Sequence, residues 1–167
     1  MADKRMPYSY SHLARILCVM AYSWLEIWRD KLGLGFGEMD VLSDYILESF
    51  VEEDFAVDEV LGGDFEEYPE EAKDKFIRLY TVIFDNLSEI DRQIRFFMKQ
   101  AEKEVPDTVT LAILRVGLGE LIYFAPDIPE KILNEAVLMA KRFCFNRANF
   151  IDAFLGDMFH YHYNEDW

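Results

Sequence analysis

The sequence contains few of the residues on which disulfide-linked proteins, metal proteins and many enzymes depend. Its 167 residues include two cysteines and three histidines. Cys18 and Cys144 lie far apart inside apolar helical patterns, without a CxxC pair or a neighbouring histidine. This arrangement favours two buried free thiols over a disulfide or a zinc site, and free thiols are typical of a reducing compartment. We therefore expect a cytoplasmic protein.

Long apolar runs are missing as well. A helix needs about 20 consecutive apolar residues to cross a bilayer, and every uninterrupted apolar run in the sequence is much shorter. The first residues, Met1 to Arg5, lack the apolar core of a secretory signal. We expect no contact with a membrane.

The motifs of common catalytic sites are also absent from the sequence. Gly33, Gly35 and Gly37 follow a predicted helix rather than a strand, and no GK[ST] motif accompanies them, which argues against a phosphate-binding loop. There is no GxSxG motif and no catalytic-cysteine context. Acidic clusters such as 52–54 have no EF-hand spacing and are interpreted as a solvated face. We expect no enzymatic activity and no cofactor.

The C-terminal tail offers one combination of metal-binding residue types. His160 and His162 are followed by Glu165 and Asp166, and together these side chains could bind a transition metal. A frayed, incidental chain end is the interpretation that we favour. We therefore predict no metal site.

The formal net charge of −15 is distributed unevenly along the chain. Residues 1–37 carry a net +2, residues 38–98 carry −13, residues 99–151 are balanced, and residues 152–167 carry −4. Phosphate binding depends on local cationic density, so this balance opposes general affinity for nucleic acids. A confined binding site remains open on the N-terminal or C-terminal part, away from the acidic middle.

Apolar residues at three- and four-residue steps predict three helices in the N-terminal half. Ser9 or Ser11 can cap the first helix, the glycine-rich segment Gly33-Leu-Gly35-Phe-Gly37 ends it, and Pro69 begins the third. The acidic segment 52–68 is predicted to be a solvated loop. The predicted buried positions are Leu13, Ile16, Leu17, Met20, Trp24 and Ile27; Val41, Tyr45, Ile46 and Phe50; and Phe76, Leu79, Tyr80, Ile83 and Leu87.

Four more helices are predicted in the C-terminal half. Ser88 and Asp91 form a weak capping box for the fourth. The fifth, from Thr108 to Pro126, has so few charges that it belongs in the middle of a bundle, and Pro129 begins the sixth. The predicted buried positions of the other three are Ile90, Ile94, Phe97 and Met98; Ile132, Ala136, Met139 and Phe143; and Phe150, Ile151, Phe154, Leu155 and Met158.

The absence of any alternating β pattern predicts an all-α fold, a compact bundle of about seven helices in a single domain over residues 1–167. We expect an N-terminal helical subdomain at 1–87, a C-terminal helical subdomain at 88–160 and a tail at 161–167.

The N-terminal segment is the part of the sequence best suited to RNA. Tyr8 and Tyr10 can stack on the splayed bases of a single strand, and cations beside them can reach phosphates. A plain polar N-terminus would explain the same residues. The candidate RNA-binding side chains are Lys4, Arg5, His12 and Arg15.

Several segments resemble the NusB family, and the resemblance is clearest in the C-terminal third of the sequence. Asp127-Ile-Pro-Glu-Lys131 is similar to the family's Asp-x-Pro-x-Lys, and Asn134–Phe143 to its Asn-Glu-Ala and Ala-Lys-x-Phe succession. The other similar segments are Ile113–Leu121, Phe150–Leu155, Ala14-Arg15 and Ala21–Trp24. The same residues also have a structural explanation, since they start helices and fill a core.

The resemblance implies two small helical bundles without catalytic activity. It further implies binding to the single-stranded boxA element of ribosomal RNA leaders, pairing with the ribosomal protein NusE, and action in the transcription elongation complex. Tyr22 and Phe150 match positions that serve the RNA–NusE function in the family, so we predict that both lie at or beside the partner contact. Each could equally be a packed core aromatic.

The sequence departs from the family pattern at four places. The usual arginine run reads Tyr8-Ser-Tyr-Ser-His-Leu-Ala-Arg15, and the usual Glu, Gly and Asn-Gly are replaced by Thr110, Cys144 and Asp152-Ala153. We therefore expect weak RNA binding that NusE strengthens. The alternative is a helical adaptor that has lost most RNA affinity and uses its acidic face for a basic partner. A NusB-like domain of an RNA cytosine methyltransferase would need an α/β cofactor domain, for which 167 residues leave no room.

Overall fold

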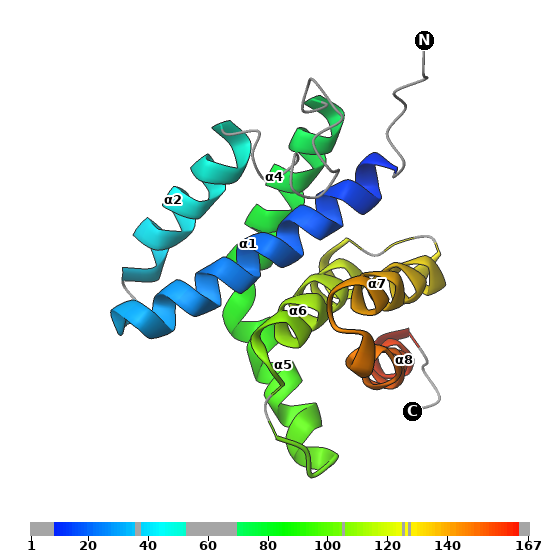
Figure 1. Ribbon diagram of the computed structural model, residues 1–167. Helices are drawn as coiled ribbons and strands as arrows, with labels where there is room; N and C mark the ends of the chain where they lie inside the picture. The colour runs from blue at the N-terminus through cyan, green and yellow to red at the C-terminus, as the bar shows by residue number, and fades with distance from the viewer. Residues whose placement is uncertain are drawn as a thin grey trace. The chain divides into compact units, whose positions relative to one another are not determined.

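The computed structural model confirms the all-α fold (Figure 1). It describes residues 9–35, 38–52, 70–104, 106–124, 126 and 128–163. Within these ranges the chain forms seven α-helices, one short 3-10 helix and no strand. The elements are α1 (Tyr10–Leu32), α2 (Met39–Glu52), α4 (Glu70–Asp85), α5 (Leu87–Gln100), α6 (Thr108–Tyr123), α7 (Pro129–Phe143), η2 (Phe145–Arg147) and α8 (Ala148–Tyr163).

The chain divides into two compact units, Met1–Thr81 and Val82–Trp167. The division falls inside α4, earlier in the chain than the predicted subdomain boundary after residue 87. Pro69 and most of the predicted acidic loop lie outside the described residues.

Two tyrosines and a serine join the three helices of the first unit. The Tyr22 hydroxyl of α1 donates a hydrogen bond of 2.8 Å to the Tyr80 carbonyl oxygen of α4, and the two rings stack with centroids 4.9 Å apart. The hydroxyls of Tyr80 and Ser43, on α2, lie 2.8 Å apart and form a hydrogen bond. Burial raises the pKa of Tyr80, so its hydroxyl stays protonated. This chain of polar contacts anchors α1 and α2 to one point on α4.

Both ends of α1 form as the sequence predicts. The Ser9 side chain accepts a hydrogen bond of 3.0 Å from the His12 backbone N–H, which caps one of the free amides at the start of a helix. Gly33 adopts the left-handed conformation with φ of 60° and donates its N–H to the Arg29 carbonyl. A glycine tolerates that conformation at little cost, which explains the end of the helix here.

Some residues predicted to be buried are exposed. On α1, Leu25 is buried while Trp24 and Ile27 point outward, and on α2 Val41 and Tyr45 are 74% and 66% exposed. Phe143 at the end of α7 is also exposed. The prediction was wrong because three- and four-residue spacing selects a broad face of a helix, and only the neighbouring helices decide how much of that face is covered.

In the second unit, α6 is buried on every side, as predicted. Residues Thr110–Leu121 are all buried, and α6 packs against α5, α7 and α8. Its buried cation, Arg115, forms two hydrogen bonds of 2.8 and 2.9 Å with the Asp91 carboxylate of α5. A paired guanidinium can be buried where a lone charge could not.

The predicted capping box of α5 does not form. The helix begins at Leu87 with Asn86 as its N-cap, so Ser88 lies inside the first turn. The Asn86 side chain donates to the Val82 carbonyl, which caps the end of α4 instead. Asp91 accepts hydrogen bonds from Arg115 rather than from the helix start.

The last helix extends further than predicted. α8 continues to Tyr163, so residues 161–163 are helical rather than frayed. The Tyr161 ring packs edge-on against Phe97 at 5.3 Å, and His162 Nε2 lies 2.8 Å from Gln93 Oε1. Glu165 and Asp166, the acidic members of the possible metal-binding combination in the tail, lie outside the described residues.

Two negative findings apply to the described part of the chain. No described helix combines the length and apolar character that a membrane crossing requires. Within the same ranges, no group of histidine, cysteine and acidic side chains is placed to hold a metal ion. Cys18 and Cys144 are both free thiols, and Cys18 is buried.

Candidate nucleic-acid and partner interface

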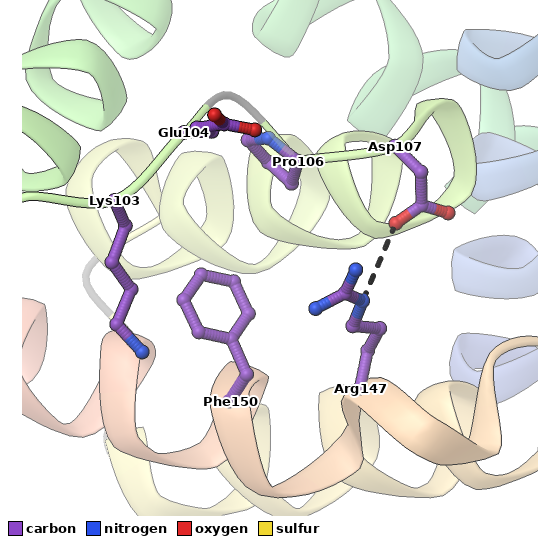
Figure 2. A pocket seen from close by; sticks show the side chains of 6 residues that line it. All are labelled: Lys103, Glu104, Pro106, Asp107, Arg147 and Phe150. Carbon is purple, nitrogen blue, oxygen red and sulfur yellow. Dashed lines mark ion pairs between the residues drawn. The ribbon is translucent and has the colours of Figure 1, made fainter.

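An open pocket in the second unit surrounds the Phe150 ring (Figure 2). The connection between α5 and α6 forms one side, and the start of α8 forms the other. Its volume is about 430 Å³. The lining residues are Lys103, Glu104, Pro106, Asp107, Arg147 and Phe150.

Lys103 is placed beside Phe150 by the way α5 ends. Glu102 has a φ of 54°, the only positive φ among the described residues other than glycine. This left-handed residue turns the chain so that the Lys103 N–H donates to the Met98 carbonyl at 2.9 Å, which closes the helix end. The Lys103 ammonium then lies 5.1 Å from the centre of the Phe150 ring. At that distance the ring attracts the cation, so the amine is held at the pocket edge.

Arg147 faces the same pocket from the opposite side. It ends η2, and its Nε lies 4.0 Å from a carboxylate oxygen of Asp107, the N-cap residue of α6 (Figure 2). Both side chains are more than half exposed. An exposed ion pair at this distance contributes at most about 1 kcal/mol, so a phosphate can replace the carboxylate as the partner of Arg147 at little cost.

A second pocket of about 340 Å³ adjoins the first and shares Asp107 and Arg147 with it. Cys144, Phe145 and Asn146 complete its lining. Phe145 is 73% exposed, which is unusual for a phenylalanine. Burial raises the pKa of the Cys144 thiol, which keeps it protonated and makes it a poor nucleophile. The second pocket therefore adds an aromatic surface and no reactive group.

The two pockets combine aromatic rings with cations in the pattern that suits single-stranded nucleic acid. Phe150 is half-buried, with its ring 6.0 Å from that of Phe154, and Phe145 stands free of the core. Exposed rings can stack on bases, and cations beside them can bind the backbone. Two acidic side chains, Glu104 and Asp107, offset the two cations of the main pocket. The charges that line the main pocket therefore balance.

The residues predicted from sequence fall in different places. Lys4 and Arg5 lie outside the described ranges. His12 is partly buried in the first turn of α1, and Arg15 is only 8% exposed. Tyr22 is fully buried in the core of the first unit, so its ring is packed against Tyr80 rather than displayed. Among the four of these residues that the structure describes, Phe150 is the one that lines a described pocket.

Sequence patterns did not indicate Lys103 or Arg147. Lys103 is brought to Phe150 from far away in the chain by the left-handed turn at Glu102, and a glutamate does not signal such a turn. Arg147 lies in the short link between α7 and α8, three residues before Phe150. Its position next to the Phe150–Leu155 motif was the one available signal.

Comparison with known proteins gives a consistent result. The family model described as the NusB family matches residues 39–159. A protein of Campylobacter jejuni (strain RM1221) named transcription antitermination protein NusB is 35% identical over 98 residues, which is 58% of this chain and 71% of that protein. Proteins of the same name from Natranaerobius thermophilus and Clostridium botulinum are each 37% identical, over 65 and 83 residues.

The matched stretches of these last two cover 38% and 48% of this chain, and 46% and 57% of the relatives. No solved structure matches the chain at comparable significance. The family model covers most of the chain and includes α2, the Phe150 pocket and the helices of the second unit up to residue 159 of α8. The chain therefore belongs to the NusB family.

Proposed function

We propose that the protein acts in transcription antitermination by binding single-stranded, boxA-type RNA together with the ribosomal protein NusE. It would do so in the transcription elongation complex, and hence in the cytoplasm, as a binding factor without catalytic activity. The observation that carries the proposal is the family match over residues 39–159, joined to relatives named for antitermination.

The geometry of the Phe150 pocket supports the RNA part of the proposal. A base stacks on the exposed side of the Phe150 ring, while the Lys103 ammonium and the Arg147 guanidinium bind adjacent phosphates. Stacking of this kind contributes roughly 1–3 kcal/mol per base and tolerates different sequences. Lys4, Arg5 and His12 remain proposed contacts at the N-terminus. Arg15 is buried and is expected to act through the packing of α1.

The need for NusE follows from the charge. Glu104 and Asp107 lie in the same pocket as the two cations, and the whole chain carries −15. RNA approaching this chain alone meets repulsion that only a cationic partner offsets. We propose that Tyr22 contributes to partner binding indirectly, because its hydrogen bond to Tyr80 holds α1 against α4.

A titration of labelled single-stranded boxA-like RNA at several salt concentrations, with and without NusE, tests the proposal. The variant Lys103→Ala/Arg147→Ala should weaken binding for every RNA sequence. It should also flatten the dependence of log K on log salt by about 1.4, since each phosphate contact on a single strand contributes about 0.7.

The matched control is Lys131→Ala/Lys141→Ala, which removes two exposed cations from α7. Equal effects of the two double variants would mean that only net charge matters and that the pocket is not the site. If the native chain binds no RNA at low salt even with NusE present, antitermination through RNA binding is excluded. The alternative function, a protein-binding adaptor, is then favoured.

A further inference from the structure

The first unit displays an apolar face that the RNA proposal does not use. We call it the α1–α2 face. It consists of Trp24, Ile27, Trp28 and Leu32 on α1, and Val41 and Tyr45 on α2, all of them exposed. Isolated exposed apolar residues are common on proteins, but a group of six with two tryptophans and a tyrosine is a recognised sign of a binding surface.

The two rows of this face lie on the same side of the helix pair. Tyr22 and Ser43 point toward α4, because each contacts Tyr80. Successive residues on a helix are about 100° apart, so Trp24 and Tyr45, two positions further along, point roughly away from α4. α1 packs against α2 (Figure 1). The Trp24 ring meets Phe50 of α2 edge-on, with the ring centroids 5.6 Å apart. The two rows therefore adjoin across the seam between the helices.

The charges that α2 places beside the face are all negative. On α2, the exposed row Asp40, Asp44 and Glu48 runs alongside Val41 and Tyr45, and the helix contains no Lys or Arg.

The two cations at the C-terminal end of α1 both have partners within the chain. Arg29 pairs with Glu26 at 2.6 Å and lies 3.8 Å from Asp30, and the Lys31 ammonium lies 5.9 Å from the centre of the Trp28 ring. The face is therefore an apolar surface with an acidic row along its α2 side.

We propose that the α1–α2 face docks an amphipathic helix of another protein, one with an apolar side and flanking Lys and Arg residues. Apolar anchors spaced three and four residues apart would sit on the aromatic row, as in other complexes of a helix with a shallow groove. Tryptophan and tyrosine dominate the energy of such contacts. The basic flank would pair with Asp40, Asp44 and Glu48, which favours encounter with a cationic partner.

The charge selects this occupant over the alternatives. A second copy of the chain would bring a second acidic border against the first, and RNA or an anionic membrane would be repelled in the same way. The acidic sequence from 53 to 68 is equally unsuited by its charge. The proposal does not depend on RNA binding, and it names a surface on the first unit, whereas the Phe150 pocket belongs to the second.

The test measures binding of a labelled 18-residue helical peptide built from leucine and lysine to the full chain. Fluorescence anisotropy of the peptide gives Kd, and the emission of Trp24 and Trp28 should shift to shorter wavelength as the face is covered. A scrambled peptide of the same composition and a leucine–glutamate peptide serve as probes without the amphipathic pattern or the charge. Both should bind at least about tenfold more weakly than the leucine–lysine peptide.

Two variants of the chain locate the site. Trp28→Ser/Tyr45→Ser and Asp40→Asn/Asp44→Asn/Glu48→Gln should each raise Kd by about tenfold or more. The matched controls are Ile128→Ser/Leu138→Ser and Glu130→Gln/Asp152→Asn/Asp157→Asn, which change equally exposed residues of α7, α8 and the segment before α7. The controls should change Kd by less than about twofold.

The proposal is overturned if the native chain does not bind the leucine–lysine peptide, or if the scrambled peptide binds as tightly. Equal weakening by the variants and their controls would also overturn it, because the binding would then reflect net charge alone. Sedimentation adds a further check: if Trp28→Ser/Tyr45→Ser dissolves a dimer of the native chain, the face joins two copies instead. Circular dichroism establishes that every variant compared retains the native helix content.

Discussion

The helices α2 and α6 are both rich in apolar residues, but they differ in how much of that apolar surface is buried. In the second unit, every residue of α6 from Thr110 to Leu121 is buried, because α5, α7 and α8 surround it. In the first unit, α2 buries Ile46 and Phe50 but leaves Val41 and Tyr45 largely exposed. The difference shows that apolar content does not fix burial, and that a group of apolar residues left uncovered indicates a surface available to a partner.

The largest expected effect comes from placing a charge on each helix. Leu118→Asp puts a carboxylate where the native side chain has no exposed surface, at a cost of several kcal/mol against a total stability of roughly 5–15 kcal/mol. We expect the variant to unfold or to melt at a much lower temperature. Val41→Asp on α2 should change stability by less than about 0.5 kcal/mol. Thermal melts followed by circular dichroism would contradict the comparison if the two variants behaved alike.

The contrast between α2 and α6 also shows how much of the burial pattern could be predicted from the sequence. For α6 the scarcity of charges was sufficient, since a helix without a polar side must be enclosed. For α2 the periodicity correctly selected Ile46 and Phe50 and wrongly added Val41 and Tyr45. Periodicity describes a single helix. Whether a second helix covers the edge of its apolar face depends on how the helices of the unit pack together.

The candidate site was less predictable than the fold for a related reason. Phe150 was identified through a family motif. Such a motif indicates which position in the sequence matters, and it does not indicate which side chains lie beside it. Its contact with Lys103 depends on the left-handed conformation of Glu102, and the place of Arg147 in the same pocket depends on how η2 leads into α8. The buried state of Tyr22 depends on α4, which is distant in the sequence. Such pairings arise from tertiary packing, and no local spacing encodes them.

A smaller effect is expected from adding a methyl group to α6. A Cβ at Gly119 would lie 2.7 Å from Ile83 Cγ1, which is too close, and Gly119→Ala should lower the free energy of unfolding by about 1–3 kcal/mol. The same change at Gly156 of α8 meets nothing within 4 Å and should stabilise the chain by up to about 1 kcal/mol. Urea denaturation measures both. A stabilising Gly119→Ala would mean that α6 is less tightly enclosed than described.

The smallest effect concerns pH and the contact between α5 and α8. Burial lowers the pKa of His162 from its ordinary 6.5, so the unfolded chain takes up a proton more readily than the folded one. The stability that this residue supplies is therefore complete above about pH 6.5 and is lost as the pH falls below it. His162→Gln should make the melting temperature less dependent on pH between about 7.5 and 5.5. An unchanged pH profile would show that the imidazole is solvated.

We propose that the second unit carries an RNA pocket and that the first carries a surface for a basic helix. The most direct measurement titrates two variants, Phe150→Ser and Tyr45→Ser, with boxA-like RNA in the presence of NusE and with the leucine–lysine peptide. The account predicts that Phe150→Ser weakens RNA binding by about tenfold and leaves peptide binding unchanged, while Tyr45→Ser does the reverse. If either variant lost both ligands, or if both variants kept both ligands, the assignment of the two sites to the two units would be wrong.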